Sequence, residues 1–303
     1  AWAARPLSER IALVQAGVAA VGAMNDEIVP ELAQMMGRPI RYGGEFGGFN
    51  ERASHMAEIA QTALADIAVG EDASFKRYIK RVPHGVVFVV APWNYPYMTA
   101  INTVAPALIA GNTVVLKHAT QTLLVGERMA KAFHSAGIPT DVFQNIFLDH
   151  DTTSDLIAQR AFDFVNFTGS VGGGKAMERA AAGTFTGIGL ELGGKDPGYV
   201  MDDADLDLAV TCALNGAFGG TGQKCTASSR LIVHEGIHDA FVDKLVDAAK
   251  SMVVDHALKE GTQIGPVVSQ GQLTENLENI GLGISEGAEL RCGGEQVERE
   301  TEG

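Results

Sequence analysis

The chain has 303 residues, and its 37 acidic residues outnumber its 23 Lys and Arg residues to give a net charge of −14. So acidic a chain lacks the clustered cations with which proteins bind nucleic acid or anionic membranes, and we expect neither partner. Hydrophobic residues make up 46% of the chain, which suffices for a large core and excludes global disorder. The length predicts about two domains.

The cysteines and the apolar runs exclude further classes of protein. Cys212, Cys225 and Cys292 are odd in number and form no CxxC pair, which argues against a disulfide framework and a cysteine zinc site. This usage is typical of a reducing compartment, and we expect a cytoplasmic protein. No apolar run approaches the roughly 18 residues that a membrane span needs. The sequence does not begin with Met and stops inside a polar run, so we expect it to be a fragment.

The first 67 residues carry apolar side chains at steps of three and four, the spacing that is typical of helices. The last of three predicted helices runs from Phe49 to Ile67 and stops at a turn-forming Gly-Glu-Asp sequence. Residues 75–82 (FKRYIKRV) are too highly charged for a buried strand and predict an exposed one. Since an exposed strand edge tends to recruit another chain, we assign residues 68–82 to an oligomerisation arm.

Short β-rich runs then alternate with segments that suit helices. Strands too far apart for hairpins and joined by helices predict a parallel sheet that is buried on both faces. We therefore predict a doubly wound α/β domain made of residues 1–67 and 83–192, followed by a second, incomplete α/β domain at residues 193–303. The strands predicted for the two domains are residues 86–90, 113–116, 142–148, 164–167, 188–190, 199–201 and 230–233.

Two sequence patterns suggest zinc or nucleoside-triphosphate chemistry, and their context argues against both. His234 and His238 match an HExxH pattern, but the first histidine ends a β-run and Gly236 interrupts any helix, so we expect no metal site. Residues 169–175 (GSVGGGK) nearly match a P-loop but lack the hydroxyl that would hold Mg²⁺. Because they follow a predicted strand and open a helix, we interpret them as an anion-binding loop.

Cys225 is the strongest candidate nucleophile. It follows a glycine-rich loop and lies beside Lys224, so we expect an accessible thiol in an electropositive environment, which favours the thiolate. The alternative is a buried structural cysteine, which is more common among cysteines in general. We assign Cys212, inside an apolar helix, to the core and leave Cys292 unassigned.

Glu191 and Asn94 are the other two candidate catalytic residues. Glu191 precedes two glycines at a predicted strand end, and we expect it to face a cleft where desolvation raises its pKa towards that of a useful base. The alternative is an exposed carboxylate at the end of a strand. Asn94 stands between two prolines after a buried strand, where α/β sheets bind ligands. Its amide is either a donor to an oxyanion or an ordinary turn residue.

Five motifs occur together in one order along the chain. They are PWNYP (92–96), PALIAGNTVVLK (106–117), FTGS (167–170), ELGGK (191–195) and GQKC (222–225). In this order and spacing they resemble the aldehyde dehydrogenase superfamily. The likeness extends through IGPVVS (264–269) and SEGAELRCGGE (285–295), so it covers the whole chain.

The resemblance implies a dinucleotide-binding domain, a catalytic domain and an NAD(P)-dependent oxidation of an aldehyde to a carboxylic acid. Cys225 would attack the aldehyde to form a thiohemiacetal, whose oxyanion Asn94 and the Cys225 N–H would stabilise. Hydride transfer would leave a thioester, and Glu191 would activate the water that hydrolyses it. No metal is expected. The residues implied to hold the cofactor are Trp93, Lys117, Thr120, Gly169, Ser170 and Gly174.

Thr120 departs from the pattern of family members that prefer NAD, which usually carry an acid three residues after the lysine that corresponds to Lys117. Without that acid a 2′-phosphate is not repelled, and Lys117 could pair with one. We predict that NADP is accepted as well as NAD, and a preference for NADP stays open.

The substrate and the activity of this stretch are less defined. The GQKCTASSR stretch resembles dehydrogenases of dicarboxylic semialdehydes, whereas the PWNYP-to-ELGGKDP half resembles more general members. The family chain continues further, so we expect these residues alone to be weakly active or inactive, and the longer protein to be a homodimer or homotetramer. A catalytically silent nucleotide-binding or structural protein is one alternative, and a thiol acyltransferase or hydrolase is another. The presence of Cys225, Glu191 and Asn94 together argues against a catalytically silent protein. A thiol acyltransferase or hydrolase normally needs a histidine base near its thiol, and none of the motifs contains one.

Overall fold

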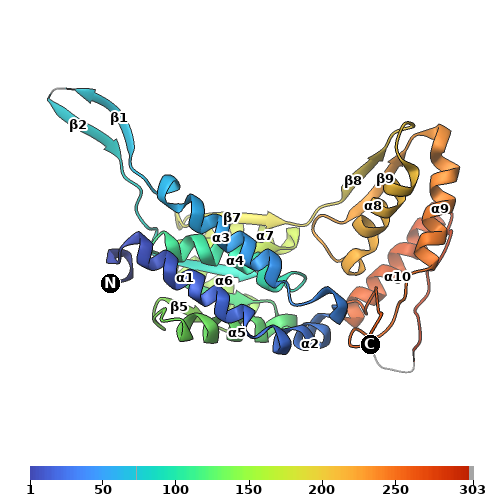
Figure 1. Ribbon diagram of the computed structural model, residues 1–303, viewed down its shortest axis with the longest axis horizontal. Coiled ribbons are helices and arrows are strands. Elements are labelled where there is room, and N and C mark those ends of the chain that lie inside the picture. Colours follow the sequence, from blue (N-terminus) through green and yellow to red (C-terminus); the bar gives the residue numbers. More distant parts are fainter. Residues whose placement is uncertain (73, 300–303) are drawn as a thin grey trace. The chain divides into compact units, whose positions relative to one another are not determined.

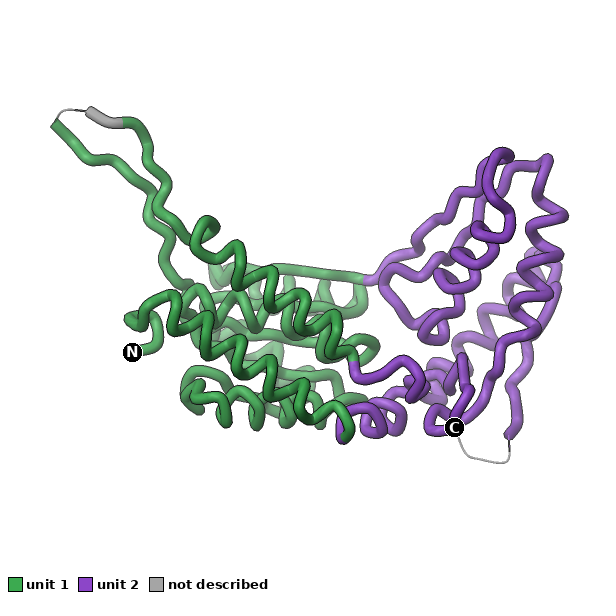
Figure 2. Tube along the Cα trace, in the orientation of Figure 1, with its two compact units in different colours: residues 1–26, 45–192 green, residues 27–44, 193–303 purple. Residues whose placement is uncertain are grey.

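The computed structural model describes residues 1–72 and 74–299, without the side chains of Glu71 and Asp72. The chain forms two compact units, each assembled from two stretches of sequence (Figure 2). Unit 1 is residues 1–26 and 45–192, and unit 2 is residues 27–44 and 193–303. Residues 27–44 therefore group with the second unit, whereas the sequence analysis placed them in the first domain. The reason is that this segment forms hydrogen bonds with residues 257–263 of unit 2.

Unit 1 is built on a parallel five-stranded sheet with the strand order β5-β4-β3-β6-β7. Its two edge strands, β5 and β7, are labelled in Figure 1. The continuous apolar run of β3 suits the centre of such a sheet, where both faces are covered. The predicted parallel-sheet α/β fold is confirmed. Its strands are β3 (Val86–Ala91), β4 (Thr113–His118), β5 (Phe143–Asn145), β6 (Phe164–Gly169) and β7 (Gly187–Leu192).

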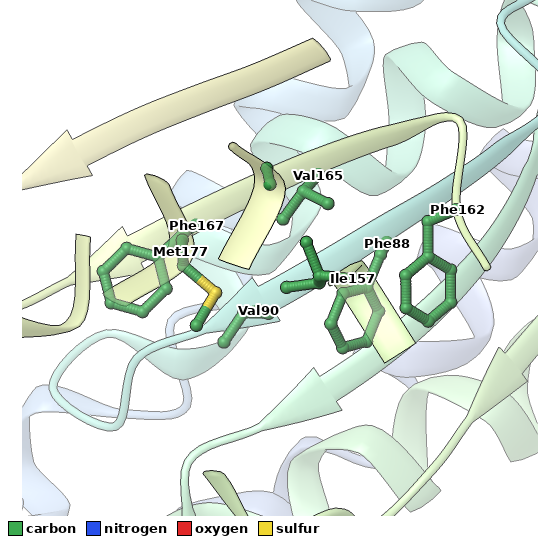
Figure 3. Close-up of a cluster of buried hydrophobic side chains, with 8 residues drawn as sticks. Phe88, Val90, Ile157, Phe162, Val165, Phe167 and Met177 are labelled. Atoms are coloured by element: carbon green, nitrogen blue, oxygen red, sulfur yellow. The ribbon is translucent and has the colours of Figure 1, made fainter. Parts of the chain in front are cut away.

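Helices α6 (His150–Ala158) and α7 (Val171–Ala181) cover one face of this sheet. Ile157 of α6 and Met177 of α7 pack with Phe88, Val165 and Phe167 of the strands in one buried cluster (Figure 3). Burying a side chain of this size stabilises the fold by about 1.5–3 kcal/mol relative to exposing it. This face is referred to below as the cluster face.

Helices α4 (Pro96–Ile109) and α5 (Leu123–Ser135) cover the opposite face. Thr103 of α4 donates its hydroxyl to the Asn166 side-chain oxygen of β6 at 2.8 Å. In α5, Gly126 lies so close to Asn145 of β5 that a Cβ atom would stand 2.0 Å from the amide oxygen. With helices on both faces, the doubly wound arrangement follows. This second face is called the α4 face.

The N-terminal helices α1 (Leu7–Gly22) and α3 (Phe46–Ala63) pack against α4. Two side chains near the N-terminus bind the last carbonyl groups of α4. Trp2, in the short helix η1 (Trp2–Ala4), donates its Nε1 hydrogen to Leu108 O at 2.9 Å, and the buried Arg10 donates its Nε hydrogen to Ile109 O at 2.8 Å. A cation at the C-terminal end of a helix also complements the helix dipole.

A two-stranded antiparallel hairpin follows α3. It pairs β1 (Ile67–Asp72) with β2 (Phe75–Ile79), and Ile67 lies opposite Ile79. The predicted helix up to Ile67 is therefore wrong, because α3 ends at Ala63 and the β-branched residues that follow pair with β2 instead. Strand β2 is exposed along its whole length, as its charge predicts.

Unit 2 contains the parallel strands β8 (Asp196–Val200) and β9 (Ser228–Val233). Its small core joins Val200 to side chains of two helices, among them Val210 and Phe241. The helices of unit 2 are α8 (Leu206–Phe218), α9 (His238–Lys250), α10 (Gln270–Ser285) and most of α2 (Asn25–Met36). The remaining short helices of the chain are η2 (Ile40–Tyr42), η3 (Thr120–Thr122), η4 (Gly219–Gly222) and η5 (Glu235–Ile237).

Within the described residues, no helix taken alone is long and apolar enough to cross a membrane. Only α1 and α2 counted together, as one bent pair, reach the required length and composition.

Candidate active site

The candidate residues of unit 1 gather at one edge of its sheet, beyond the carboxyl ends of the parallel strands. Trp93 and Asn94 follow β3, Lys117 lies at the end of β4 and Ser170 follows β6, while Glu191 lies near the end of β7. Because parallel strands all have their carboxyl ends at the same edge, the βα connections bring these residues to that edge of the sheet.

The two faces of the sheet divide these residues. Val115 packs against the cluster of α6 and α7, so Lys117, two residues further along β4, projects from the cluster face. Leu190 and Leu192 pack against the same cluster, so Glu191 between them projects from the α4 face. The sheet therefore separates the candidate cofactor lysine from the candidate base.

The first turn of α7 is shaped for an anion. Ser170 is its N-cap and accepts a hydrogen bond from Gly173 N at 3.1 Å, while Val171 and Gly172 are exposed. A side chain at Gly174 would force the Leu192 side chain to move, because a Cβ atom there would lie 2.7 Å from it. The exposed helix start after β6, predicted as an anion-binding loop, thus has backbone N–H groups and a helix dipole for a phosphate.

Lys117 is a buried cation on the same cluster face, with only 4% of its surface exposed. Burial lowers the pKa of its ammonium, and the Asp149 carboxylate acts in the opposite direction. Asp149 itself is the N-cap of α6 and accepts from Thr152 N at 2.7 Å. The ammonium makes one long contact, 3.5 Å to His118 O. A buried donor at this edge fits a ribose hydroxyl or a phosphate oxygen.

His118 is a buried imidazole with 1% of its surface exposed. Burial lowers its pKa from 6.5 to about 3, and the Lys117 charge acts in the same direction. Between these two pKa values the unfolded chain binds a proton that the folded chain excludes. The free energy of unfolding should therefore fall as the pH drops below about 6.5, by up to about 1.4 kcal/mol per pH unit.

Denaturant unfolding of the wild type and of His118→Leu from about pH 7 to about pH 4 measures this contribution. The difference in unfolding free energy between the two proteins should move in favour of the variant as the pH falls. The exposed His55 of α3 offers a matched control, because His55→Leu should leave the wild-type pH dependence in place. Parallel pH profiles for the wild type and His118→Leu would contradict the burial argument.

Asn94 is held in one orientation by its own loop. Its Oδ1 accepts the backbone N–H of Tyr95 at 3.0 Å, and Pro96 begins α4 directly afterwards. With the oxygen end of the amide held in this way, the donor end is turned away from the Tyr95 N–H. The side chain is half-buried. The amide nitrogen is thus the end of this side chain that could donate to an oxyanion, while the bond to the Tyr95 N–H is one that a turn asparagine also makes.

Glu191 is exposed in this structure. Unit 1 by itself therefore does not form the expected cleft around this carboxylate. Its neighbours on the α4 face of β7 explain the exposure: Gly187 and Gly189 carry no side chain, and a Cβ on Gly189 would lie 2.8 Å from the amide nitrogen of Asn166. Glu191 is the first position along this side of β7 that bears a side chain, and water reaches it.

Cys225 lies in unit 2, in an exposed loop, as the sequence predicts. The loop follows three consecutive residues with left-handed backbone, Gly220, Thr221 and Gly222, at φ values of 64°, 60° and 69°. Left-handed backbone is costly for a residue with a side chain, so surrounding contacts must hold Thr221 there. Its hydroxyl donates to Gly265 O at 3.3 Å.

The hydrogen-bond partner of Lys224 and the exposure of Cys212 differ from what the sequence predicts. The Lys224 ammonium donates to Asn215 O at 3.0 Å and so binds a carbonyl near the end of α8, which gives it a structural partner other than the thiol. Cys212 is exposed on α8 rather than part of the core, because the buried side of that helix is formed by Val210 and Ala213. Cys292 is half-buried.

The HExxH pattern lies in a strand-to-helix connection, as expected. His234 is the N-cap of η5 and accepts from Gly236 N at 3.1 Å, while His238 begins α9. Within residues 1–72 and 74–299, no three or more His, Cys, Asp or Glu side chains are grouped as ligands for a metal ion.

Sequence analysis missed the contacts that hold the Cys225 loop. Gln223 accepts the Val268 N–H on its Oε1 at 3.0 Å, and the Thr221 hydroxyl binds Gly265. Both acceptor and donor on the other side belong to the IGPVVS sequence at residues 264–269, whose family resemblance alone indicates no contact with Cys225. Its partner in the fold could not be read from the sequence, because the two segments are more than 40 residues apart.

The chain matches the family model for the aldehyde dehydrogenase family over residues 1–303. It belongs to the aldehyde dehydrogenase family. The resemblance carried by the five motifs is thereby confirmed, and the parallel-sheet fold agrees with that of solved members.

Two curated relatives and one solved structure illustrate the match. An alpha-ketoglutaric semialdehyde dehydrogenase of Bacillus subtilis (strain 168) is 40% identical over 234 residues, covering 77% of this chain and 48% of the relative. A betaine aldehyde dehydrogenase of the same strain is 36% identical over 294 residues, covering 91% and 60%. The crystal structure of an NAD-dependent aldehyde dehydrogenase from Sinorhizobium meliloti has a TM-score of 0.94 at 34% identity, covering 98% of this chain and 60% of that one. The chain thus spans about half to three fifths of the length of these proteins.

Proposed function

We propose that the protein carrying this chain oxidises an aldehyde to a carboxylic acid with NAD or NADP. The observation that carries the proposal is an exposed cysteine on a left-handed glycine-rich loop, in a chain matched by the aldehyde dehydrogenase model from end to end. Asn94 supplies a fixed amide and Glu191 a solvent-accessible carboxylate, which are the other two groups that the reaction needs.

In the proposed reaction the Cys225 thiolate adds to the aldehyde carbon, and the carbonyl oxygen takes up the electron pair. Asn94 and the Cys225 N–H donate hydrogen bonds to that oxyanion. When bound, NAD(P) supplies the acceptor for the hydride that leaves the same carbon, so a thioester stays on Cys225. Glu191 then takes a proton from water, the hydroxide adds to the thioester carbon, and the carbon–sulfur bond breaks to release the acid.

The chain leads from the proposed base into unit 2 within three residues. In unit 2, Gly194 lies beside the Cys225 loop, since a Cβ atom on it would stand 3.8 Å from Cys225 O. Glu191 is three residues earlier in the chain, and three extended residues span at most about 11 Å.

The groups on the cluster face fit a dinucleotide. We propose that the exposed start of α7, with Gly169, Ser170 and Gly174, receives the pyrophosphate, because its N–H groups and dipole favour an anion. Lys117 would bind the adenosine ribose or its 2′-phosphate from β4, which β3 separates from β6 in the sheet. The half-buried Trp93 would line the same edge.

Thr120 is the proposed determinant of cofactor choice. It is exposed at the start of η3, and its hydroxyl contacts only the neighbouring Gln121 side chain, at 3.3 Å, among the contacts of the described residues. Thr120→Glu would place a carboxylate beside a 2′-phosphate. We expect it to lower kcat/KM with NADP relative to NAD by about 100-fold, since like-charge contacts cost several kcal/mol.

Steady-state kinetics with both cofactors test this expectation. Thr120→Val serves as the control, because it removes the hydroxyl without adding charge and should leave the NADP-to-NAD ratio nearly unchanged. A wild-type protein that uses NAD alone, or an unchanged ratio in Thr120→Glu, would contradict the assignment.

For the substrate we propose a semialdehyde of a dicarboxylic acid. The support is the 40% identity to a protein named for alpha-ketoglutaric semialdehyde. The similarity to a betaine aldehyde dehydrogenase makes a cationic aldehyde the main competitor. Absorbance of the reduced cofactor, followed with an anionic semialdehyde, betaine aldehyde and a neutral aldehyde, decides between them. No reduction with any of the three would indicate a catalytically silent protein.

For the assembly we propose that the hairpin of β1 and β2 contacts another subunit in a homodimer or homotetramer. Its apolar side chains Phe75, Tyr78 and Ile79 are 52–66% exposed, which is unusual for residues of this kind.

A further inference from the structure

Residues 37–45, called the connecting segment below, lead from unit 2 back into unit 1. At its start, the segment meets the loop of residues 264–268 backbone against backbone. A Cβ atom on Gly265 would stand 2.0 Å from Gly37 O, and one on Gly37 would stand 2.4 Å from Pro266 O. Gly37 also has a left-handed φ of 73°. Glycine is therefore required on both sides of this contact.

Further along, the connecting segment is fixed to unit 2 by hydrogen bonds. Ile40 N donates to Ala257 O at 3.0 Å, and the Tyr42 hydroxyl donates to Gln263 O at 3.0 Å. These bonds tie the segment to the residues that directly precede the 264–268 loop.

The same loop holds the nucleophile. Val268 N donates to Gln223 Oε1 at 3.0 Å and Gly265 O accepts from Thr221, and Cys225 follows Gln223 by two residues. One set of contacts within unit 2 thus extends from the connecting segment through the 264–268 loop to the thiol loop.

At its other end, the connecting segment reaches the first turn of α4 within unit 1. Glu45 adopts a left-handed φ of 66°, and its Oε2 accepts the Met98 N–H at 2.9 Å. Met98 lies in the first turn of α4, four residues after Asn94. The carboxylate therefore caps the helix that begins directly after the Asn94 loop.

We propose that Glu45 is a positioning residue for oxyanion stabilisation. By capping α4 it holds the first turn of the helix that begins directly after the Asn94 loop, and with it the Asn94 amide, within unit 1. The inference rests on the proposed function, in which Asn94 and Cys225 act on the same carbonyl. Because a misplacement of about 1 Å in such a donor costs up to about 100-fold, loss of the cap should reduce the rate of the chemical step.

A double-mutant cycle on the protein that carries this chain tests the proposal. Glu45→Ala should lower kcat/KM for the aldehyde by about 10- to 100-fold and leave the Kd of the reduced cofactor unchanged. Glu45→Gln keeps an oxygen that accepts the Met98 N–H and should retain most of the activity. In an Asn94→Ala background, Glu45→Ala should cost less than about twofold, because the residue it positions is already gone.

Two further variants distinguish loss of the Glu45 carboxylate from poor folding and from a general effect of removing a surface charge. Glu45→Gly removes the carboxylate but suits the left-handed backbone, so it should lose activity like Glu45→Ala even if the alanine protein folds poorly. Glu51→Ala, at an exposed carboxylate of α3, should behave like the wild type. Full activity of Glu45→Gly, or equal losses with and without Asn94, would overturn the positioning role. Full activity of Asn94→Ala alone would instead overturn the proposed function of Asn94.

Discussion

Cys225→Ala should abolish aldehyde oxidation, with kcat falling by on the order of 10⁴-fold or more. The reason is that the proposed reaction has no path to a thioester without the thiol, and loss of a covalent nucleophile removes the whole sequence of steps that depends on it. Binding of the cofactor should persist, because Lys117 and the start of α7 belong to unit 1 whereas Cys225 belongs to unit 2. Stopped-flow absorbance for hydride transfer and fluorescence titration of the reduced cofactor measure the two properties separately.

Cys212 provides a matched control. It is also exposed and also lies in unit 2, so Cys212→Ala changes an accessible thiol without changing the proposed nucleophile. This variant should keep the wild-type kcat and KM. Iodoacetamide should inactivate the Cys212→Ala protein as fully as the wild type, because the Cys225 thiol is still present. An active Cys225→Ala protein would show that the thiol is not the nucleophile.

Glu191→Gln should separate the two halves of the reaction. Glutamine cannot take the proton from water, so the thioester should form at a near-normal rate and then hydrolyse slowly. We expect a burst of reduced cofactor of about one equivalent per active site, followed by a steady-state rate that is about 10²- to 10⁴-fold lower than that of the wild type.

The exposed position of Glu191 makes this test informative. A carboxylate open to water can act as a base only if water reaches the thioester from its side, and the two glycines that follow it lead to the Cys225 loop. Glu178→Gln, on the exposed surface of α7, is the control and should show no burst beyond that of the wild type. Equal losses of burst and steady state in Glu191→Gln would assign Glu191 to an earlier step.

The sequence predicted the framework of unit 1 because its signals are local. The apolar run at residues 86–90 can be stable only in a sheet covered on both faces, and the GSVGGG loop after β6 can only open a helix close to the sheet. The exposure of Cys225 likewise follows from the glycines before it, which give the loop no side chains with which to form a core.

The errors come from contacts that join distant segments. Nothing in residues 27–44 shows that they pack with residues 257–266 rather than with the helices on either side of them, since an apolar helix face suits both partners. Ile67 continues a helical pattern by spacing but pairs with Ile79 across a hairpin. Cys212 was expected in the core, yet it lies on the side of α8 that unit 2 leaves open.

The role of Glu45 could not be predicted for the same reason. Its carboxylate caps a helix that begins about 50 residues further along the chain, and a glutamate after two glycines has no local pattern that indicates such a partner. Only the fold brings Met98 N within hydrogen-bond distance. Contacts of this kind determine where a donor points, whereas the motif around Asn94 determines only that a donor is present.

The most direct measurement of the proposed chemistry is mass spectrometry of the Glu191→Gln protein after exposure to aldehyde and oxidised cofactor. Peptide mapping should locate the acyl group on Cys225, with a mass increase that corresponds to the thioester of the acid formed, and should find it only when the cofactor is present. An acyl group on another residue, or no covalent adduct while cofactor is still reduced, would contradict the account.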